Sequence, residues 1–392
     1  MNVKLTSLFL LLVAACSSKD HTGTPGATDD GGGRPAEDAG GGLADSETDA
    51  SDASGSSGIR WIGRIDTTDP TAARFAWSGT GILATVSGTT ISAKLRTSGA
   101  SDAVFFQPVI DGMPGTRFSV PNGEMTVTLG SNLTDGDHKV ELYRETEGRY
   151  GISAFAGFTE GTMKGSPPSS GRRIEFVGDS ITAGYGNLGS EQHPNYGPDP
   201  TGGCHFSTAT ESAYMTYGAM AARTLGAEAS LIALSGWGIY RDNGNNTANV
   251  MPAVYANLLG TQAMPAWSFQ PEPQAVVINL GTNDFAMGDP GEAQFEGALT
   301  SFIATVRGKY PNALILCTTG PLLFGAGLTS AIAYIQAVVA AAHAAGDMKV
   351  QYLDFGQQNI MLGTGCDYHP NTTEHQAMAD KLVAALRAAL GW

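Results

Sequence analysis

Four short segments in the second half of the chain carry residue types that together can hydrolyse an ester. They are Gly178-Asp179-Ser180, Ser235-Gly236-Trp237, Gly281-Thr282-Asn283-Asp284 and Cys366-Asp367-Tyr368-His369. A serine hydroxyl attacks a carbonyl carbon only when a base accepts its proton. A histidine, with an ordinary pKa of about 6.5, suits that role near neutral pH. We therefore interpret Ser180 as the nucleophile and His369 as its base.

Each of the first three segments follows an apolar stretch that is typical of a buried strand. Predicted strands over 174–177, 231–234, 275–280, 313–317 and 350–355 alternate with predicted helices over 211–225, 294–310, 330–345 and 373–390. This alternation predicts an α/β fold, in which helices cover both faces of a parallel sheet in a three-layer domain over residues 171–392. Ligands bind at the carboxyl ends of such strands, so we expect the four segments to meet at one edge.

Taken in order, the four segments resemble the signature blocks of the SGNH or GDSL-type hydrolases. The resemblance covers the chain from Ile174 to its end. It implies an oxyanion hole formed by the backbone N–H groups of Ser180 and Gly236 and the side-chain amide of Asn283. Each residue alone has a plainer interpretation. Gly236 suits a turn, Asn283 suits an Asx turn, and a histidine before a proline is common in loops.

One position departs from that family pattern. Most of these hydrolases have an aspartate three residues before the histidine, but here that position is Cys366 and the acid is Asp367. A shift by one residue on an irregular loop changes where the carboxylate points. Two orienting groups for His369 therefore remain open, namely the Asp367 side chain and a backbone carbonyl.

Longer segments around the same blocks resemble carbohydrate esterase family 2. They are Arg172–Ser180, Thr210–Tyr214, Ser235–Arg241 and Asn279–Phe285. The resemblance implies a small N-terminal β-sandwich before the hydrolase domain, and a histidine that often lacks the usual aspartate. It also implies removal of acetyl groups from plant polysaccharides such as xylan or glucomannan, with a preference for 6-O-acetyl groups, and no cofactor.

The region before the hydrolase domain has the period-two pattern of short strands. Residues 82–86, 91–95, 125–129 and 138–143 read as strands, and Asp111-Gly112 and Asn122-Gly123 as turns. Many short strands with frequent turns predict a β-sandwich or jelly roll over residues 59–165. It carries no recognisable catalytic set.

The N-terminus resembles a bacterial lipoprotein leader. A basic start and a short apolar run lead to Val13-Ala14-Ala15-Cys16, so residues 1–16 are expected to be a signal peptide that ends at a lipidated Cys16. An ordinary signal peptide cut nearby is the alternative. Residues 17–58 are rich in Gly, Asp and Ser and are expected to form a disordered tether. We expect an exported protein anchored by lipid in the cell envelope, at the outer membrane or cell surface, with no other membrane contact.

Several further residues have expected roles. Trp237 and Tyr368 flank the proposed site and either stack on sugar rings or only pack against the protein.

Cys204 and Cys366 are expected to form a disulfide, since export leads to an oxidising compartment, and Cys317 is expected to be a buried thiol. The histidine and cysteine spacing suggests no metal site. A net charge of -15 argues against nucleic acid as a partner.

Two alternatives to a polysaccharide acetylesterase remain at this stage. One is another esterase of the same type, such as a lipase, a thioesterase or a deacetylase of cell-wall glycan. The other is a non-catalytic surface protein that binds glycan through its β-sandwich, which would not need Ser180.

Overall fold

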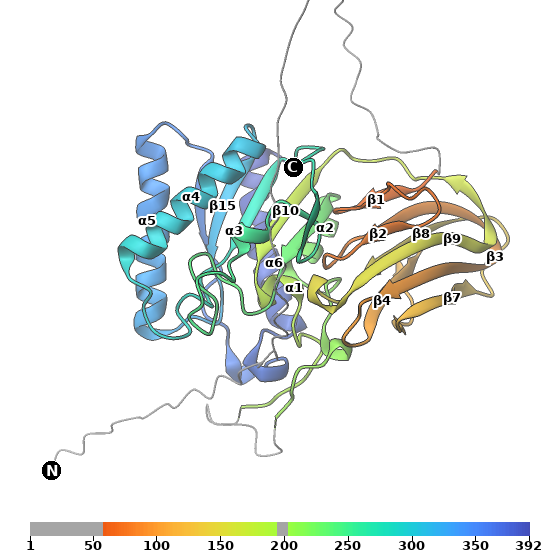
Figure 1. The fold of residues 1–392 in the computed structure, drawn as a ribbon, viewed down its shortest axis with the longest axis horizontal. Coiled ribbons are helices and arrows are strands. Elements are labelled where there is room, and N and C mark those ends of the chain that lie inside the picture. Colours follow the sequence, from red (N-terminus) through yellow and green to blue (C-terminus); the bar gives the residue numbers. More distant parts are fainter. Residues whose placement is uncertain (1–57, 194–202) are drawn as a thin grey trace, which may run out of the picture. The chain divides into compact units, whose positions relative to one another are not determined.

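The computed structural model describes residues 58–193 and 203–392, and Figure 1 shows their course. They form an antiparallel β domain followed by an α/β domain. The expected signal peptide, Cys16 and all of the tether except Gly58 lie outside the described residues.

The N-terminal domain is built from one nine-stranded antiparallel sheet that folds around its own core. The sheet order is β2-β9-β3-β8-β4-β5, with β1 and β7 also paired to β3, and β6 to β4. The strands are β1 (Arg60–Ile62), β2 (Ala73–Phe75), β3 (Gly81–Ser98), β4 (Val104–Ile110), β5 (Met113–Pro114), β6 (Phe118–Val120), β7 (Gly123–Ser131), β8 (Asp137–Arg144) and β9 (Ile152–Gly165). This confirms the predicted N-terminal β architecture.

Strand β3 connects the layers of this domain. Its first part pairs with β8 and its second part with β7, while β9 pairs along most of its length. The expectation of two separate strands at 82–86 and 91–95 was wrong. The chain stays extended through Gly88, and the irregularity appears as a shift of register between Ser87 and Ser92 rather than as a turn.

The C-terminal domain contains a five-stranded parallel sheet, as predicted. Its order is β11-β10-β14-β15-β16. The strands are β10 (Arg173–Gly178), β11 (Glu228–Ala233), β14 (Ala275–Asn279), β15 (Leu314–Thr319) and β16 (Val350–Asp354), and the helices are α1 (Ser180–Ala183), α2 (Tyr217–Leu225), α3 (Met251–Val254), α4 (Glu292–Lys309), α5 (Gly325–Ala344) and α6 (Thr372–Leu390). A small hairpin of β12 (Asn257–Leu259) and β13 (Gln262–Ala266) is inserted before β14.

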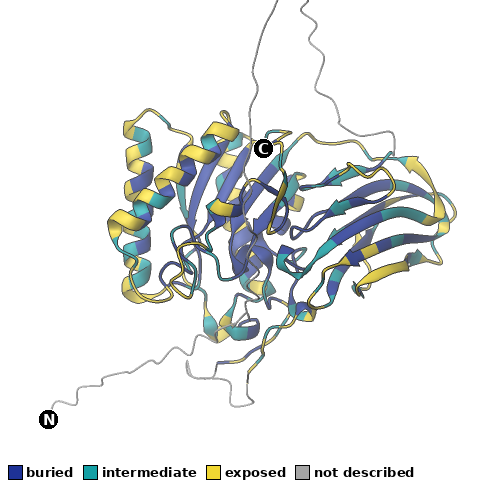
Figure 2. Cartoon of the chain, viewed as in Figure 1, coloured by how far each residue is buried: buried dark blue, intermediate teal, exposed yellow. Residues whose placement is uncertain are grey.

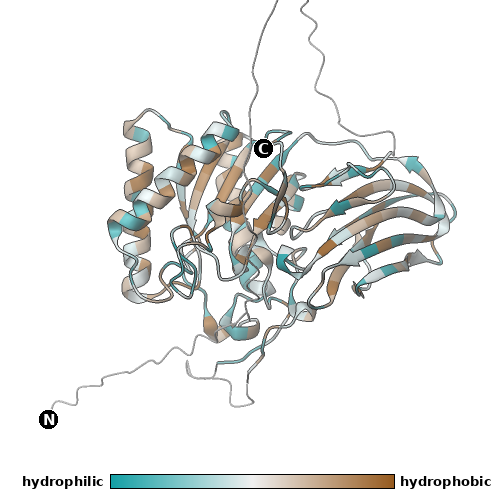
Figure 3. Cartoon of the chain, in the orientation of Figure 1, coloured by the Kyte–Doolittle hydropathy of each residue, from teal (hydrophilic) through white to brown (hydrophobic). Residues whose placement is uncertain are grey.

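Alternate residues of each parallel strand face opposite helical layers. Val177 and Ile278 pack in a core with α4 and α5, whereas Phe176 and Val277 pack in a second core with α2 and α6. Figure 2 shows the resulting buried strands between helices with exposed outer faces, and Figure 3 shows the same strands as apolar. Burial on both faces explains why these strands read as continuous apolar runs in the sequence.

Helix α5 is the one described helix that is long and apolar enough to cross a membrane, judged by length and composition alone. We did not expect such a segment after the leader. Ala331, Ile335, Val338 and Val339 on α5 are buried in the core that it shares with α4 and the sheet.

Candidate active site

Ser180 lies at the tight turn between β10 and helix α1. A side chain at Gly178 would meet Thr182 Oγ1 at 2.0 Å, so only glycine fits the end of this strand. Asp179 caps the helix, since its carboxylate accepts a hydrogen bond of 3.0 Å from the Ile181 N–H. Ser180 is the first helical residue, and an N–H at that position has no partner within the helix. The turn therefore presents both the Ser180 hydroxyl and its backbone N–H.

The structure brings His369 to Ser180 across 189 residues of sequence. His369 Nε2 lies 2.9 Å from Ser180 Oγ. On the other side of the ring, Nδ1 lies 3.1 Å from the backbone carbonyl oxygen of Asp367. If Nδ1–H donates to that carbonyl, Nε2 carries the lone pair that accepts the Ser180 proton. The arrangement is a Ser–His dyad oriented by a peptide group.

The Asp367 side chain points to a different set of partners. Its carboxylate accepts hydrogen bonds from the Tyr185 hydroxyl at 3.0 Å and from the Phe206 N–H at 2.9 Å, and contacts His205 Nδ1 at 3.0 Å. The backbone of Asp367 is left-handed, with φ of 50°, and Tyr368 follows with φ of 62°. The residue predicted as the orienter thus contacts His369 through its carbonyl oxygen, while its carboxylate anchors the loop.

Aromatic rings that the sequence did not indicate as site residues cover one side of the dyad. The Tyr185 ring lies 4.2 Å from the His369 ring, and Phe206 stacks on Tyr185 at 3.9 Å. Tyr185 follows Ser180 closely in the sequence, which is a weak signal. No sequence signal indicated that Phe206 and His205 belong to the site. The disulfide-linked loop that carries them is distant in sequence from both Ser180 and His369.

Burial sets the protonation of two groups at the site. Desolvation lowers the pKa of His369 to about 4, against the weaker opposing effect of the Asp367 carbonyl. The imidazole is therefore neutral near pH 7 and able to accept a proton. Burial, followed by the charge of Asp284, raises the pKa of Asp179 to about 7.

The loop after β11 carries Gly236, whose φ of 84° suits glycine. Asp284 holds the following residues, because its carboxylate accepts hydrogen bonds from the N–H groups of Ile239, Tyr240 and Arg241 at 2.7 to 3.0 Å. The Asn283 amide nitrogen donates to the Trp237 carbonyl at 2.9 Å and lies 3.3 Å from the Asp179 carboxylate. These contacts bring Gly236 and Asn283 to the Ser180 turn, and their oxyanion role stays a prediction.

The two proposed sugar-stacking residues differ in exposure. Trp237 is partly buried and packs against the core shared with α4 and α5. Tyr368 is 43% exposed, and its ring stacks on His193 with the centroids 4.4 Å apart. Tyr368 therefore has a partly exposed ring and directly precedes His369 in the chain, whereas much of Trp237 is used for packing.

The cysteines pair as expected. Cys204 and Cys366 form a disulfide, with their Cα atoms 4.4 Å apart, and Cys317 is buried and free. The Asp367 N–H also donates to the Cys204 carbonyl at 2.9 Å. The loop that carries His369 is thus tied covalently and by hydrogen bonds to the Phe206 segment.

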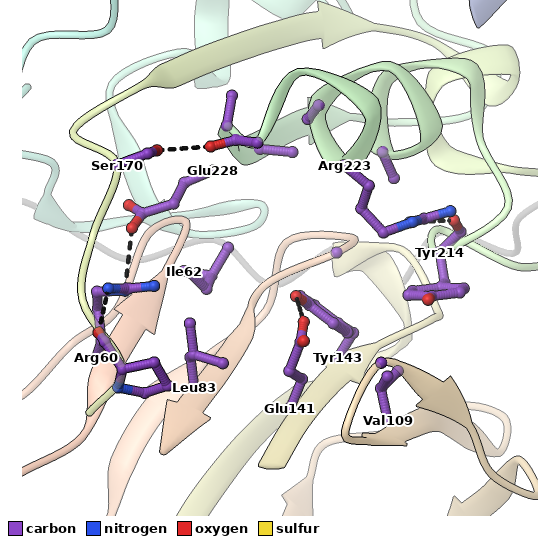
Figure 4. Close-up of a pocket in the computed structure, with 18 of the residues that line it drawn as sticks. Arg60, Ile62, Leu83, Val109, Glu141, Tyr143, Ser170, Tyr214, Arg223 and Glu228 are labelled. Carbon is purple, nitrogen blue, oxygen red and sulfur yellow. Dashed lines mark hydrogen bonds and ion pairs between the residues drawn. The ribbon is translucent and has the colours of Figure 1, made fainter. Parts of the chain in front are cut away.

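A pocket of about 400 Å³ lies elsewhere in the molecule, between the N-terminal sheet and helix α2. Figure 4 shows Arg60 paired with Glu228 at one side of it, and Tyr143 contacting Glu141 at the other. Neither Ser180 nor His369 lines this pocket. Among residues 58–193 and 203–392, no group of three or more His, Cys, Asp or Glu side chains is placed to hold a metal ion.

Comparison with known proteins places this site in a family. Residues 61–168 match the family described as carbohydrate esterase 2 N-terminal, and residues 176–377 match the GDSL-like lipase/acylhydrolase family. A family two carbohydrate esterase from Clostridium thermocellum, solved in complex with cellohexaose, superposes with a TM-score of 0.79 at 36% identity, over 85% of this chain and 99% of that one. The chain belongs to carbohydrate esterase family 2.

Curated relatives agree with this assignment. The family two esterase described here is 37% identical to the cellulase/esterase CelE of Acetivibrio thermocellus, over 86% of this chain but only 40% of that longer protein. It is 27% identical to an acetylxylan esterase/glucomannan deacetylase of Cellvibrio japonicus, over 85% of this chain and 89% of the relative. The protein is thus a serine esterase of the carbohydrate esterase type.

Proposed function

We propose that this esterase removes O-acetyl groups from plant polysaccharides such as xylan and glucomannan through an acetyl-enzyme formed on Ser180. The observation that carries the proposal is the 2.9 Å contact between Ser180 Oγ and His369 Nε2, in a chain of carbohydrate esterase family 2. The names of its relatives supply the substrate class, since one is an acetylxylan esterase and glucomannan deacetylase. Acetylated polysaccharide or oligosaccharide is accordingly the proposed partner.

The reaction follows from the dyad in two halves. Ser180 Oγ attacks the acetyl carbonyl carbon while its proton passes to His369 Nε2. The Ser180 and Gly236 N–H groups and the Asn283 amide stabilise the negative oxygen. The sugar oxygen then leaves with the proton from His369, and the acetyl group stays on Ser180. In the second half, His369 takes a proton from water as that water attacks the acetyl carbonyl carbon. His369 then returns the proton to Ser180 Oγ as acetate leaves.

Two features support a neutral glycan as substrate, namely the charge of the whole chain and an exposed aromatic ring in the loop of His369. The net charge of -15 disfavours polyanionic substrates but does not oppose an uncharged polymer. Tyr368 presents an exposed ring next to His369, and aromatic faces are suited to stacking on sugar rings. A Tyr368→Ala variant is expected to raise KM for acetylated glycan more than for p-nitrophenyl acetate.

Acyl-chain and glycan selectivity test this proposal against the other esterase activities. Acetate release from acetylated xylan and glucomannan is compared with hydrolysis of p-nitrophenyl acetate, butyrate and octanoate. We expect release from at least one glycan and a steep decline with chain length. Efficient cleavage of octanoate without glycan deacetylation would instead indicate a lipase. Deacetylation of cell-wall glycan, without deacetylation of xylan or glucomannan, would instead indicate a cell-wall glycan deacetylase.

We also propose that Cys16 is lipidated and anchors the enzyme in the cell envelope, at the outer membrane or cell surface. The support is the Val13-Ala14-Ala15-Cys16 pattern after a short apolar run. Metabolic labelling with a fatty acid should mark the parent chain and leave Cys16→Ala unlabelled. Equal labelling of both chains, or none of the parent, contradicts the anchor.

A further inference from the structure

A segment of the N-terminal domain reaches the loop that carries Gly236. Residues 145–151 connect β8 to β9 and include the single turn Gly148–Tyr150. Glu147, on this segment, accepts a hydrogen bond of 2.7 Å from the Ser235 N–H. The Arg149 guanidinium donates to the Ser235 carbonyl oxygen. Both backbone polar groups of Ser235 are therefore held by side chains that lie more than eighty residues earlier in the chain.

The contact from Arg149 acts on the peptide group that matters for the reaction. The Ser235 carbonyl and the Gly236 N–H belong to the same planar peptide, and in a trans peptide they point in opposite directions. A guanidinium fixed on the carbonyl therefore fixes the direction in which the Gly236 N–H points. A cation on the carbonyl oxygen also polarises the peptide, which makes its N–H a better donor.

The residues that hold Ser235 are themselves held in place. Glu147 is fully buried, and its second carboxylate oxygen lies 3.2 Å from Arg149 Nε. Its backbone N–H lies 3.2 Å from the Glu211 carboxylate, and its carbonyl accepts a hydrogen bond of 3.0 Å from Arg144. The Arg149 side chain is itself one-third exposed, so its position depends on its contacts with the buried Glu147 carboxylate and the Ser235 carbonyl. Because Glu147 is buried and held at its backbone, these contacts preset Arg149 before substrate binds.

We propose that Arg149, supported by Glu147, is a positioning residue that orients the Gly236 N–H of the oxyanion hole, so that the N-terminal β domain takes part in catalysis. The inference rests on the proposed function, because it takes Gly236 as an oxyanion donor. It assigns the β domain a role in catalysis, beyond the glycan binding considered from the sequence.

The test compares Arg149→Met and Arg149→Lys with the full-length parent, using p-nitrophenyl acetate as substrate. Loss of a whole oxyanion donor costs about a hundred- to a thousandfold in rate. A misdirected donor should cost less, so we expect kcat of Arg149→Met to fall about ten- to a hundredfold, with KM nearly unchanged. Lysine cannot reach both Glu147 and the Ser235 carbonyl as the guanidinium fork does, so Arg149→Lys should give an intermediate kcat.

A matched control separates positioning from domain docking. Arg117 also belongs to the β domain and donates to backbone carbonyls of the hydrolase domain, at Ala209 and Glu211. Arg117→Met should lower the melting temperature about as much as Arg149→Met but leave kcat near that of the parent. Equal losses of kcat in the two methionine variants would mean that Arg149 only holds the two domains together, and would overturn the inference.

Ser180→Ala, measured alongside, distinguishes a failure of the Arg149 inference from a failure of the proposed function. If Ser180→Ala is inactive and Arg149→Met keeps the kcat of the parent, only the inference is wrong. If Ser180→Ala keeps the parent activity, the proposed function is wrong and the inference fails with it. If Arg149→Met does not fold, Arg149→Lys decides. A lowered kcat at unchanged KM and melting temperature supports the inference, and a parental kcat overturns it.

Discussion

At the scale of single residues, the dyad differs from a triad in what orients its histidine. His369 Nδ1 contacts the Asp367 carbonyl, and that carbonyl faces the ring because Asp367 and Tyr368 both adopt left-handed backbone conformations. A peptide carbonyl fixes the tautomer of the imidazole as a carboxylate does. It carries only a partial charge, however, and so stabilises the imidazolium less.

Substitution of the Asp367 side chain tests this difference. In a triad, replacing the aspartate by asparagine costs about 10⁴-fold in kcat. Here Asp367→Asn keeps the carbonyl, and asparagine tolerates left-handed backbone, so we expect a loss in kcat of less than about tenfold. Asp367→Ala is the comparison, since it also weakens the contacts to Tyr185 and Phe206. A loss near 10⁴-fold in Asp367→Asn would mean that the carboxylate orients the histidine.

The pH dependence of kcat/KM reports the protonation of His369. Below its pKa of about 4, the protonated imidazole cannot accept the Ser180 proton, so activity is retained well below pH 6.5 and falls near pH 4. Asp179, with a pKa of about 7, ionises as pH rises, and this leaves the neutral His369 imidazole in place. Any inflection from Asp179 is therefore separate from the acid limb of His369. Acetate release measured from about pH 3 to pH 8 checks this. An acid limb centred near pH 6.5 contradicts it.

The sequence predicted the four blocks because each functional residue lies next to a recognisable strand or turn. It left the Asp367 question open, since the answer depends on two backbone angles that no residue type dictates. The contacts of Glu147 and Arg149 with Ser235 were beyond its reach. They join two domains, and neither residue type nor local spacing indicates which distant peptide a side chain contacts.

At the scale of elements, the predicted strands of the parallel sheet were confirmed, and two helices were wrong at their starts. Helix α5 begins at Gly325 rather than at the predicted Ser330. The pattern predicts a helix over 211–225, but α2 begins at Tyr217. The residues before it are held by the β domain, since Glu145 contacts the Ala213 and Tyr214 N–H groups and Arg117 bonds the Glu211 carbonyl. Tertiary contacts thus replaced the hydrogen bonds of the expected first turns.

The disulfide acts on the element that carries His369. Cys366 begins the turn Cys366–Tyr368, so removing its bond to Cys204 frees both the Asp367 carbonyl and the Phe206 segment. Cys204→Ser should lose about 2–4 kcal/mol of stability and part of its kcat. Denaturation and kinetics with and without a reducing agent check this.

The reducing agent should affect the parent and leave Cys204→Ser unchanged. Parental kcat and stability in Cys204→Ser would show that the hydrogen bonds alone hold the loop.

At the scale of the whole described molecule, the two domains share a buried ion pair. Arg64 of the β domain lies 3.1 Å from Glu175 on β10, and Glu175 also accepts hydrogen bonds from the Tyr255 hydroxyl at 2.6 Å and the Tyr310 hydroxyl at 3.2 Å. The side chain of Arg64 is fully buried. The domain order was predictable from the change of hydrophobic period, but this contact was not, because each partner lies in an ordinary strand or loop pattern.

Arg64→Met leaves Glu175 buried without its cation. We expect the free energy of unfolding to fall by about 3–5 kcal/mol, the usual cost of removing one partner of a buried pair. Urea denaturation measures it. Lys94→Met removes an ion pair with Glu124 that is exposed on both sides, and should change stability little. Similar effects in the two variants would contradict an interface that depends on Arg64.

The most direct test of the central claim is acetate release from acetylated xylan and glucomannan by the full chain and by Ser180→Ala. The account predicts release by the parent and a loss of at least about a thousandfold in the variant, because the dyad has no second nucleophile. A Ser180→Ala variant that folds like the parent and releases acetate at a comparable rate would contradict it.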